Sequence, residues 1–298
     1  MSGRSQRGAA VVMAMLVVAV VATLVAGAYW RQSVMIRQAE NELSYAQAKW
    51  LIRGAIDWAG VILREDARTS SVDHLGEPWA VPLADTHLNE NDGRDPVYLA
   101  GEIHDEQAKF NLRNLAGPAG VIPRELDVLR RLLALVDASE SLAETVAERV
   151  LSAVPGGAGR KQVALGLVSI DDLIGLEGVG AAAIERLRPF LTVLPQPTPV
   201  NANTAPAEVL AARFENLALA DARRLTASRD RAYFKDRADF LSRIGQLGLQ
   251  ASDAEIAVAT RFFSVDGTVS YQRARLHVLA LLRREANRVE TVWLREAA

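Results

Sequence analysis

The stretch that decides the fold is residues 7–31, RGAAVVMAMLVVAVVATLVAGAYWR. Its apolar part, residues 9–30, contains no charged side chain. As an α-helix rising 1.5 Å per residue this part is ~33 Å long, which matches a hydrocarbon core of roughly 30 Å. Arg4 and Arg7 precede it and favour a cytoplasmic N-terminus, although Arg31 on the far side weakens that bias. The sequence therefore predicts one transmembrane helix over residues 9–30.

The apolar run passes without a break into an amphipathic pattern over residues 31–66. No proline occurs before Pro78, so one helix is expected to run from the membrane to about Asp66. Apolar or small residues recur at three- and four-residue steps, the spacing of one helical face: Leu43, Ala46, Trp50, Gly54, Trp58 and Val61. A secretory signal would have a shorter apolar part and then a small-residue cleavage site. The plain interpretation is a single-pass anchor with a helical stalk.

The composition excludes several classes of protein. The chain has 298 residues, half of them apolar, which is enough for one large or two ordinary folded domains. Its net charge of -2 provides no general attraction to nucleic acid. Without cysteine it has no disulfide, zinc–thiolate site or cysteine nucleophile. The four histidines are scattered and no hydrolase, phosphate-loop or dinucleotide motif occurs, so no enzyme is expected.

The C-terminal residues predict a β-hairpin. Apolar and polar residues alternate in 276–280 and in 289–293, on either side of a break at 284–287. Residues 97–103 predict another strand, after a polar, turn-rich segment, and a second short strand follows them. These strands are expected to form a small antiparallel sheet.

Between the strands, residues 124–259 have a helical pattern with a weak internal repeat. The first copy, 169–193, ends in FLTV, and the second, 201–265, ends in ATRFFSV. The proline-rich linker 194–200 between them should be extended. The predicted fold class is therefore α+β. A long N-terminal helix packs on the small sheet, and a large helical domain of two helix-hairpin-helix (SAM-like) modules is inserted between strands.

The N-terminal junction QRGAAVVM, residues 6–13, resembles the class III leader of type IV pilins and type II secretion pseudopilins. The resemblance implies that residues 1–8 are a leader, that Arg7 marks the junction, and that a prepilin peptidase cleaves after Gly8. It also implies N-methylation of Ala9. The apolar helix is then retained as the core of a filament.

Met13 departs from the pattern of most pilins and pseudopilins, which have a glutamate at this fifth mature position. In those families the carboxylate neutralises the amino terminus of the neighbouring subunit, because an unpaired ammonium in a bilayer is costly. Lack of the glutamate is a trait of one minor pseudopilin, the K type of the general secretion pathway. A subunit without it is suited to be first, at the tip.

Two further motifs, DHLGEPWA at residues 73–80 and KFNLRNL at residues 109–115, are similar to the K-type minor pseudopilins. Family members often have asparagine where this chain has Arg113. The resemblance extends along nearly the whole chain and implies the pseudopilin fold with a large helical insertion. It divides the chain into a leader, membrane helix, periplasmic helix, sheet region and inserted domain: 1–8, 9–30, 31–66, 67–110 with 262–298, and 111–261.

The function implied by this resemblance is mechanical. The chain would sit in the inner membrane with its N-terminus in the cytoplasm and its body in the periplasm. It would prime a short filament that pushes folded exoproteins across the outer membrane. Expected partners are the I-, J- and H-type minor pseudopilins, the prepilin peptidase and the exoproteins. Contacts to other pseudopilins would involve Leu43, Trp50 and Trp58.

Two other functions compete with this hypothesis. GLEGVGAAAIERL, residues 175–187, resembles a helix-hairpin-helix loop, whose amides can hold a nucleic-acid phosphate. That likeness would suit a membrane-anchored DNA-binding protein of an uptake system. However, Glu177 and Glu185 flank the loop, so a tight interhelical turn at Gly178 and Gly180 is preferred and no nucleic acid is expected. The third possibility is a periplasmic scaffold that keeps its first eight residues.

No cofactor is required by this hypothesis, although calcium is possible through the family resemblance. Oxygen donors are dense in one loop: Asp85, Asn89, Asn91, Asp92 and Asp95. With Gly93 at the sixth position of a calcium loop, Leu88 would be the first ligand, so the standard pattern fails and a solvated turn is preferred. Equally arguable donors are Asp171, Asp172, Asn201 and Asn203. The metal ligands are left unassigned.

Overall fold

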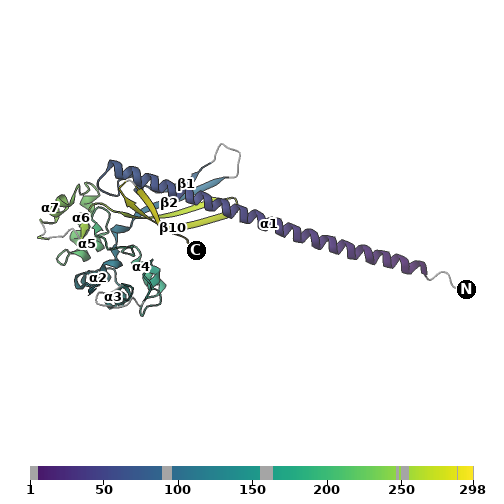
Figure 1. Cartoon of the computed structure of the whole chain (residues 1–298), viewed down its shortest axis with the longest axis horizontal. Helices are drawn as coiled ribbons and strands as arrows, with labels where there is room; N and C mark the ends of the chain where they lie inside the picture. The colour runs from purple at the N-terminus through teal and green to yellow at the C-terminus, as the bar shows by residue number, and fades with distance from the viewer. Residues whose placement is uncertain are drawn as a thin grey trace.

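In the computed structural model, one helix dominates the molecule (Figure 1). The structure describes residues 6–88, 96–154, 164–245, 248–249, 255–286 and 288–297. Helix α1, Gln6–Thr69, has 64 residues and is about 96 Å long at 1.5 Å per residue. It extends freely from the body over its N-terminal half and packs on a sheet over its C-terminal half. The single helix expected to end near Asp66 ends at Thr69.

The packed half of α1 buries one face. Its buried apolar residues follow each other at three- and four-residue steps: Ala48, Ile52, Ile56, Ala59 and Leu63. They share a core with apolar residues from the sheet, including Leu99, Val269 and Val278. The helix is thereby fixed across one face of the sheet.

The sheet has five antiparallel strands in the order β1-β2-β9-β10-β11. The strands are β1 (Leu83–His87), β2 (Val97–Asp105), β9 (Phe262–Tyr271), β10 (Ala274–Glu285) and β11 (Arg288–Glu296). The predicted hairpin is β10–β11, and the predicted strand at 97–103 is β2. The expected α+β fold, a long helix on an antiparallel sheet with inserted helices, is confirmed.

Strand β9 corrects the predicted repeat. Residues 259–265, expected to close the second helical module, instead lead into β9, the central strand of the sheet. Two features hid this strand in the sequence. Phe262 and Phe263 are both buried, on opposite faces of the sheet, and Gly267 interrupts the apolar alternation that follows. The edge strand β1 was also missed, because it is short and its register with β2 is irregular.

Between β2 and β9 the chain forms the helical region, which has its own core. Its α-helices are α2 (Pro123–Leu135), α3 (Leu142–Ser152), α4 (Ala181–Leu187), α5 (Ala207–Arg213), α6 (Leu219–Arg229) and α7 (Arg237–Gly245). Its described 3₁₀-helices are η2 (Glu106–Ala108), η3 (Leu112–Leu115) and η5 (Ile170–Leu173), whereas η1 (Pro78–Ala80) lies before the sheet, between α1 and β1. Two-residue strands pair as β3 (Phe110–Asn111) with β6 (Leu191–Thr192), β4 (Ala116–Gly117) with β5 (Gly120–Val121), and β7 (Val200–Asn201) with β8 (Ile256–Ala257).

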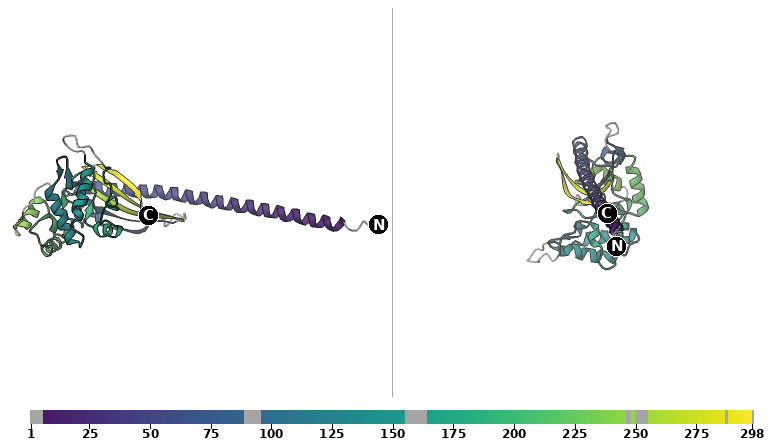
Figure 2. Two further views of the ribbon diagram at one scale, coloured as in Figure 1. Left: turned by 90° about the horizontal axis from the view of Figure 1, so that it is seen from below. Right: turned by 90° about the vertical axis from the view of Figure 1, so that its right-hand side faces the viewer.

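The helical region lies at the end of the molecule opposite the N-terminus (Figure 2). It covers part of the sheet face that α1 leaves free, where Leu194 packs with Phe262 and Leu281. The molecule therefore consists of the projecting N-terminal half of α1, the five-stranded sheet with the C-terminal half of α1, and the helical region.

Candidate functional site

The N-terminal half of α1 is an apolar surface that none of the described residues covers. Within the described residues, α1 is the one helix that is long and apolar enough to cross a membrane, and its apolar segment is not buried at all. Met13 is 73% exposed. Such a continuous apolar surface is stable in a bilayer or against other apolar helices, and is costly in water.

The residues predicted for processing lie at the beginning of this helix. Gly8 and Ala9 are exposed in the first turns of α1, and Met13 follows one turn after Ala9. The side chain of Arg7 lies outside the described part of the chain. Cleavage after Gly8 and methylation of Ala9 remain predictions.

The second candidate surface is the outer face of α1, defined by Leu43, Ala46, Trp50, Gly54, Trp58 and Val61. All six residues are exposed, on the side of the helix away from the sheet core. Trp50 is 72% exposed and Trp58 52%. Large exposed aromatic side chains on a folded body are typical of contact surfaces. The three residues predicted to contact other pseudopilins are therefore available for contact.

A buried polar cluster joins the sheet to the helical region. Asp73, from the DHLGEPWA motif, accepts a hydrogen bond from the Thr260 amide (2.7 Å) and pairs with the Arg284 guanidinium. Its backbone carbonyl accepts from the Asn201 side chain (3.1 Å). The motif thus holds β10 and the helical region together.

Arg284 donates hydrogen bonds to more than one carboxylate. It also donates to Asp66 at the end of α1 (2.8 Å) and to the Thr260 carbonyl (3.1 Å). The oxygens of Asp66, Asp73 and Glu77 come within 4.8 Å of one another, and all three residues are buried. Burial raises the pKa of Asp66 to about 6, and the nearby Glu77 adds to the effect against Arg284. We call these three carboxylates and Arg284 the carboxylate–arginine cluster.

Asp105, at the end of β2, extends this polar junction. It accepts hydrogen bonds from Thr204 (2.6 Å), Asn201 (2.8 Å) and the Gln107 amide (2.7 Å). Burial nevertheless raises its pKa to about 6. Burial therefore raises the pKa of both Asp66 and Asp105 at this junction.

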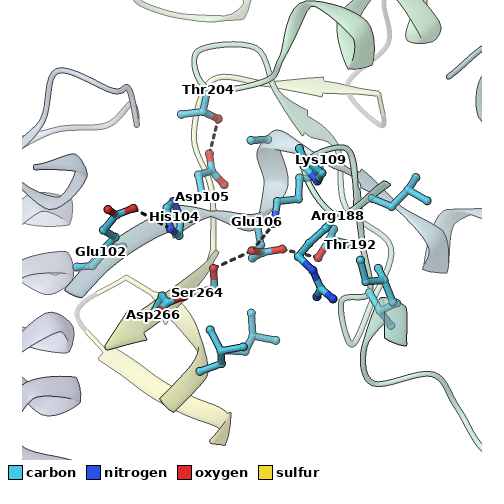
Figure 3. A pocket seen from close by; sticks show the side chains of 18 of the residues that line it. Glu102, His104, Asp105, Glu106, Lys109, Arg188, Thr192, Thr204, Ser264 and Asp266 are labelled. Carbon is cyan, nitrogen blue, oxygen red and sulfur yellow. Dashed lines mark hydrogen bonds and ion pairs between the residues drawn. The ribbon is translucent and has the colours of Figure 1, made fainter. Parts of the chain in front are cut away.

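A cleft of about 650 Å³ separates the helical region from the open face of the sheet (Figure 3). Glu106 lies in it and accepts from Thr192 (2.6 Å), Ser264 (2.7 Å) and Lys109 (2.8 Å). Burial opposes the ionisation of Glu106, but Lys109 and the two hydroxyls outweigh it and lower its pKa. These bonds link η2 to β6 and β9, so Glu106 fixes the two sides of the cleft.

A second polar contact crosses this cleft. Asp171 accepts from Arg188 (2.7 Å), its neighbour in the helical region, and from Arg295 (3.2 Å) of β11. Near the sheet, Glu102 lies 3.4 Å from His104. The charged groups of the cleft are thus paired with one another, an arrangement that sets the orientation of two bodies.

Most of the predicted calcium donors that the structure describes make hydrogen bonds or ion pairs within the fold. Asp172 accepts from the Val168 and Ser169 amides (2.7 and 3.0 Å), and Asn203 binds the Phe234 backbone (3.0 and 2.8 Å). Asn201 and Asp171 have the contacts given above. Asp85 is exposed, and residues 89–95 lie outside the described residues.

The carboxylate–arginine cluster was missed as a unit. Its three carboxylates are the group of potential metal ligands found within the described residues, and Arg284 donates to two of them. Asp73 and Glu77 belong to a motif noted in the sequence, but Asp66 and Arg284 carry no local signal. Calcium binding remains a prediction without assigned ligands.

The helix-hairpin-helix loop forms a tight turn. Gly178 has a φ of 79°, and a Cβ on it would lie 3.0 Å from Leu142 of α3, so glycine is required. Arg188, after α4, is held by Asp171 and Glu185 (both 2.7 Å). The loop packs against α3 and Arg188 is engaged by two carboxylates, so neither observation favours a phosphate site.

Comparison with known proteins gives the family. Residues 108–196 and 200–260 match two models described as type II secretion system protein K. The protein K of Pseudomonas aeruginosa is 33% identical, over 94% of this chain and 90% of its own. That of Klebsiella pneumoniae is 30% identical, over 94% and 93%.

A solved structure shows the same fold. A chain in the GspK–GspI–GspJ complex of enterotoxigenic Escherichia coli superposes with a TM-score of 0.72, covering 88% of this chain and 99% of that one, at 21% identity. This match covers more of the chain than the two family models, which span residues 108–196 and 200–260. With its exposed apolar helix, pseudopilin-like body and these relatives, the chain belongs to the type II secretion system protein K family.

Proposed function

We propose that this chain is the minor pseudopilin at the tip of a type II secretion pseudopilus, where it primes filament assembly. One observation carries the proposal: the uncovered apolar helix has Met13 where a carboxylate would reach a neighbouring amine. After cleavage at Gly8 the new ammonium of Ala9 lies at the membrane helix. A subunit without an acid at position 13 has no means of neutralising the amine of a predecessor, so it can be first.

The shape of the body supports the same position. The helical region broadens the end of the molecule farthest from the membrane helix (Figure 2). A further subunit stacked above it would meet this bulk rather than a helix. As the filament grows from below, the tip would push folded exoproteins toward the outer-membrane channel. As a member of the protein K family, the chain is a structural component of secretion rather than an enzyme.

The membrane arrangement follows from the charges and the helix. Arg4 and Arg7 keep the N-terminus in the cytoplasm, residues 9–30 cross the inner membrane, and the body lies in the periplasm. The partners are the I- and J-type minor pseudopilins, with the H type beneath them, and the prepilin peptidase. The E. coli relative occurs in a complex with GspI and GspJ, which supports the first two.

The helical region is proposed to consist of two related helix-hairpin-helix modules. The two family models divide it between residues 196 and 200, at the proline-rich linker. Both parts contribute to one continuous core, including Leu132 from the first and Phe240 from the second. They would therefore act as a single rigid end piece.

N-terminal sequencing and intact mass of the protein from inner membranes test the assignment. With an active prepilin peptidase, the chain should begin at methylated Ala9, and without the peptidase at Met1. A chain that keeps Met1 in both strains, or that is cut beyond Trp30, would remove the basis of the proposal.

A further inference from the structure

An apolar crevice of about 70 Å³ lies between α1 and strands β2 and β9. Two of the residues that line it, Gly101 and Gly267, are paired across β2 and β9. On the helix side Ala55 and Ala59 face it. Small residues on both walls leave the space open.

Close contacts within the fold explain why glycine occupies positions 101 and 267. A Cβ on Gly101 would lie 2.9 Å from the Asp266 carbonyl oxygen, and one on Gly267 would lie 3.3 Å from the Ile52 side chain. The neighbouring strand therefore requires glycine at 101, and the packed helix favours it at 267. Larger side chains in place of Ala55 or Ala59 would fill the crevice.

The crevice opens onto exposed apolar side chains. Trp58 and Val81 both line it, and Val81 is 68% exposed. Trp58 also belongs to the outer face of α1. Trp50, Gly54 and Trp58 follow one another at one-turn steps, so this row of the helix ends at the mouth of the crevice.

Gly54 forms a notch in this surface. It lies one helical turn from both Trp50 and Trp58, and a Cβ on it would have no atom within 4 Å. Glycine inside a helix costs about 1 kcal/mol relative to alanine, and no packing within the described chain requires it here. A glycine between two exposed tryptophans is where another backbone can approach closely.

We infer that the membrane-anchored helix of a partner pseudopilin lies along α1 on its β1 side, crosses it at Gly54, and inserts one aliphatic side chain into the crevice beside Trp58. This inference rests on the proposed function. Helix α1 joins the outer face to the apolar span 9–30 without a break, so a partner helix that runs parallel to α1 enters the membrane too. A secreted exoprotein would not.

The size of the crevice selects the inserted group. Its volume of about 70 Å³ is roughly half of the 150 Å³ cavity that admits benzene. It therefore fits the end of a valine, leucine or isoleucine better than an aromatic ring. The tryptophans at its mouth would cover the inserted side chain from water.

Substitutions at Gly54 test the crossing point, with the full-length chain and its cognate I-type minor pseudopilin co-purified in detergent. Gly54→Ala should weaken the complex about threefold and Gly54→Leu at least tenfold, without loss of folding, because both residues favour helix over glycine. Gly60→Ala is the matched control. It also removes a helical glycine, but toward Val289 of β11, where a Cβ has ordinary 3.6 Å contact. Equal binding by Gly54→Leu and the wild type would overturn the inference.

Photo-crosslinking tests the side of the helix. With p-benzoylphenylalanine in place of Trp58 or Val81, the full-length chain in membranes should form an adduct with the I-type pseudopilin. The same probe in place of Val292, an exposed residue of β11 on the other flank, should not. Adducts from Val292 alone would refute the inference and leave the proposed function standing. If the wild-type chain forms no complex at all, the proposed function fails and the inference with it.

Discussion

The two halves of α1 have the same secondary structure and opposite environments. Around residues 9–30 every side of the helix is apolar and uncovered, whereas between Ser44 and Leu63 one face is buried on the sheet and the opposite face is exposed. No face of the first half packs on the described body, so a bilayer or other apolar helices must surround it. The second half has one face packed on the sheet, and its tryptophans on the opposite face are exposed. A single helix thus combines an uncovered apolar segment with a structural element of the body.

The strongest attachment of the second half is expected at the carboxylate–arginine cluster. Arg284→Met should lower the free energy of unfolding by about 3–5 kcal/mol, because it leaves Asp66 and Asp73 buried without their cation. Denaturant titration of the full-length chain in detergent measures the change. Arg68→Met, at the exposed end of the same helix, should change it by less than about 0.5 kcal/mol. Equal effects would mean that the cluster does not hold the helix.

The contrast between the inner and outer faces can be tested with one substitution on each. Ile52→Ala should cost about 2–5 kcal/mol, since Ile52 is buried in the sheet core. Trp50→Ala should leave the unfolding midpoint nearly unchanged and reduce co-purification with the I-type partner. If Trp50→Ala destabilises the isolated chain as strongly as Ile52→Ala, the outer face is not free for a partner.

The contribution of Asp66 to the pH dependence of stability should be opposite to that of an acid whose pKa is lowered in the fold, such as Glu106. The folded-state pKa of Asp66 is raised from 3.8 to about 6, so the folded chain binds this proton more tightly than the unfolded chain. The resulting stabilisation is complete below pH 4 and is lost as the pH rises through about 6. At about 1.4 kcal/mol per pKa unit, the loss from Asp66 is at most about 3 kcal/mol. Asp105 acts in the same direction.

Unfolding titrations between pH 4.5 and 7.5 measure this effect. Asp66→Asn, which keeps the size of the side chain without its titration, should flatten the pH profile. A wild-type profile that rises over this range would show that the acids at the junction are not protonated as their burial predicts.

Sequence reasoning reached the long helix, the C-terminal hairpin and the helical insertion because each has a local pattern. The outer face of α1 could also be predicted, since its spacing is helical and its exposure follows from the burial of the opposite face. The residue pattern did not predict strand β9, because Phe262 and Phe263 are buried on opposite faces and Gly267 follows, although the sheet region implied by the resemblance, 262–298, contains this strand. The junction could not be predicted because Asp66, Asp73 and Arg284 meet only when the chain returns to the end of α1 after more than two hundred residues.

The position at the tip can be observed directly. Pseudopili from cells that overproduce the major subunit would be labelled with gold-conjugated antibodies against residues 111–261 and imaged by electron microscopy. We predict one label cluster at one end of each filament, and fewer filaments when this chain is deleted. Label distributed along the filaments, or an unchanged number of filaments without the chain, would contradict a subunit that primes assembly at the tip.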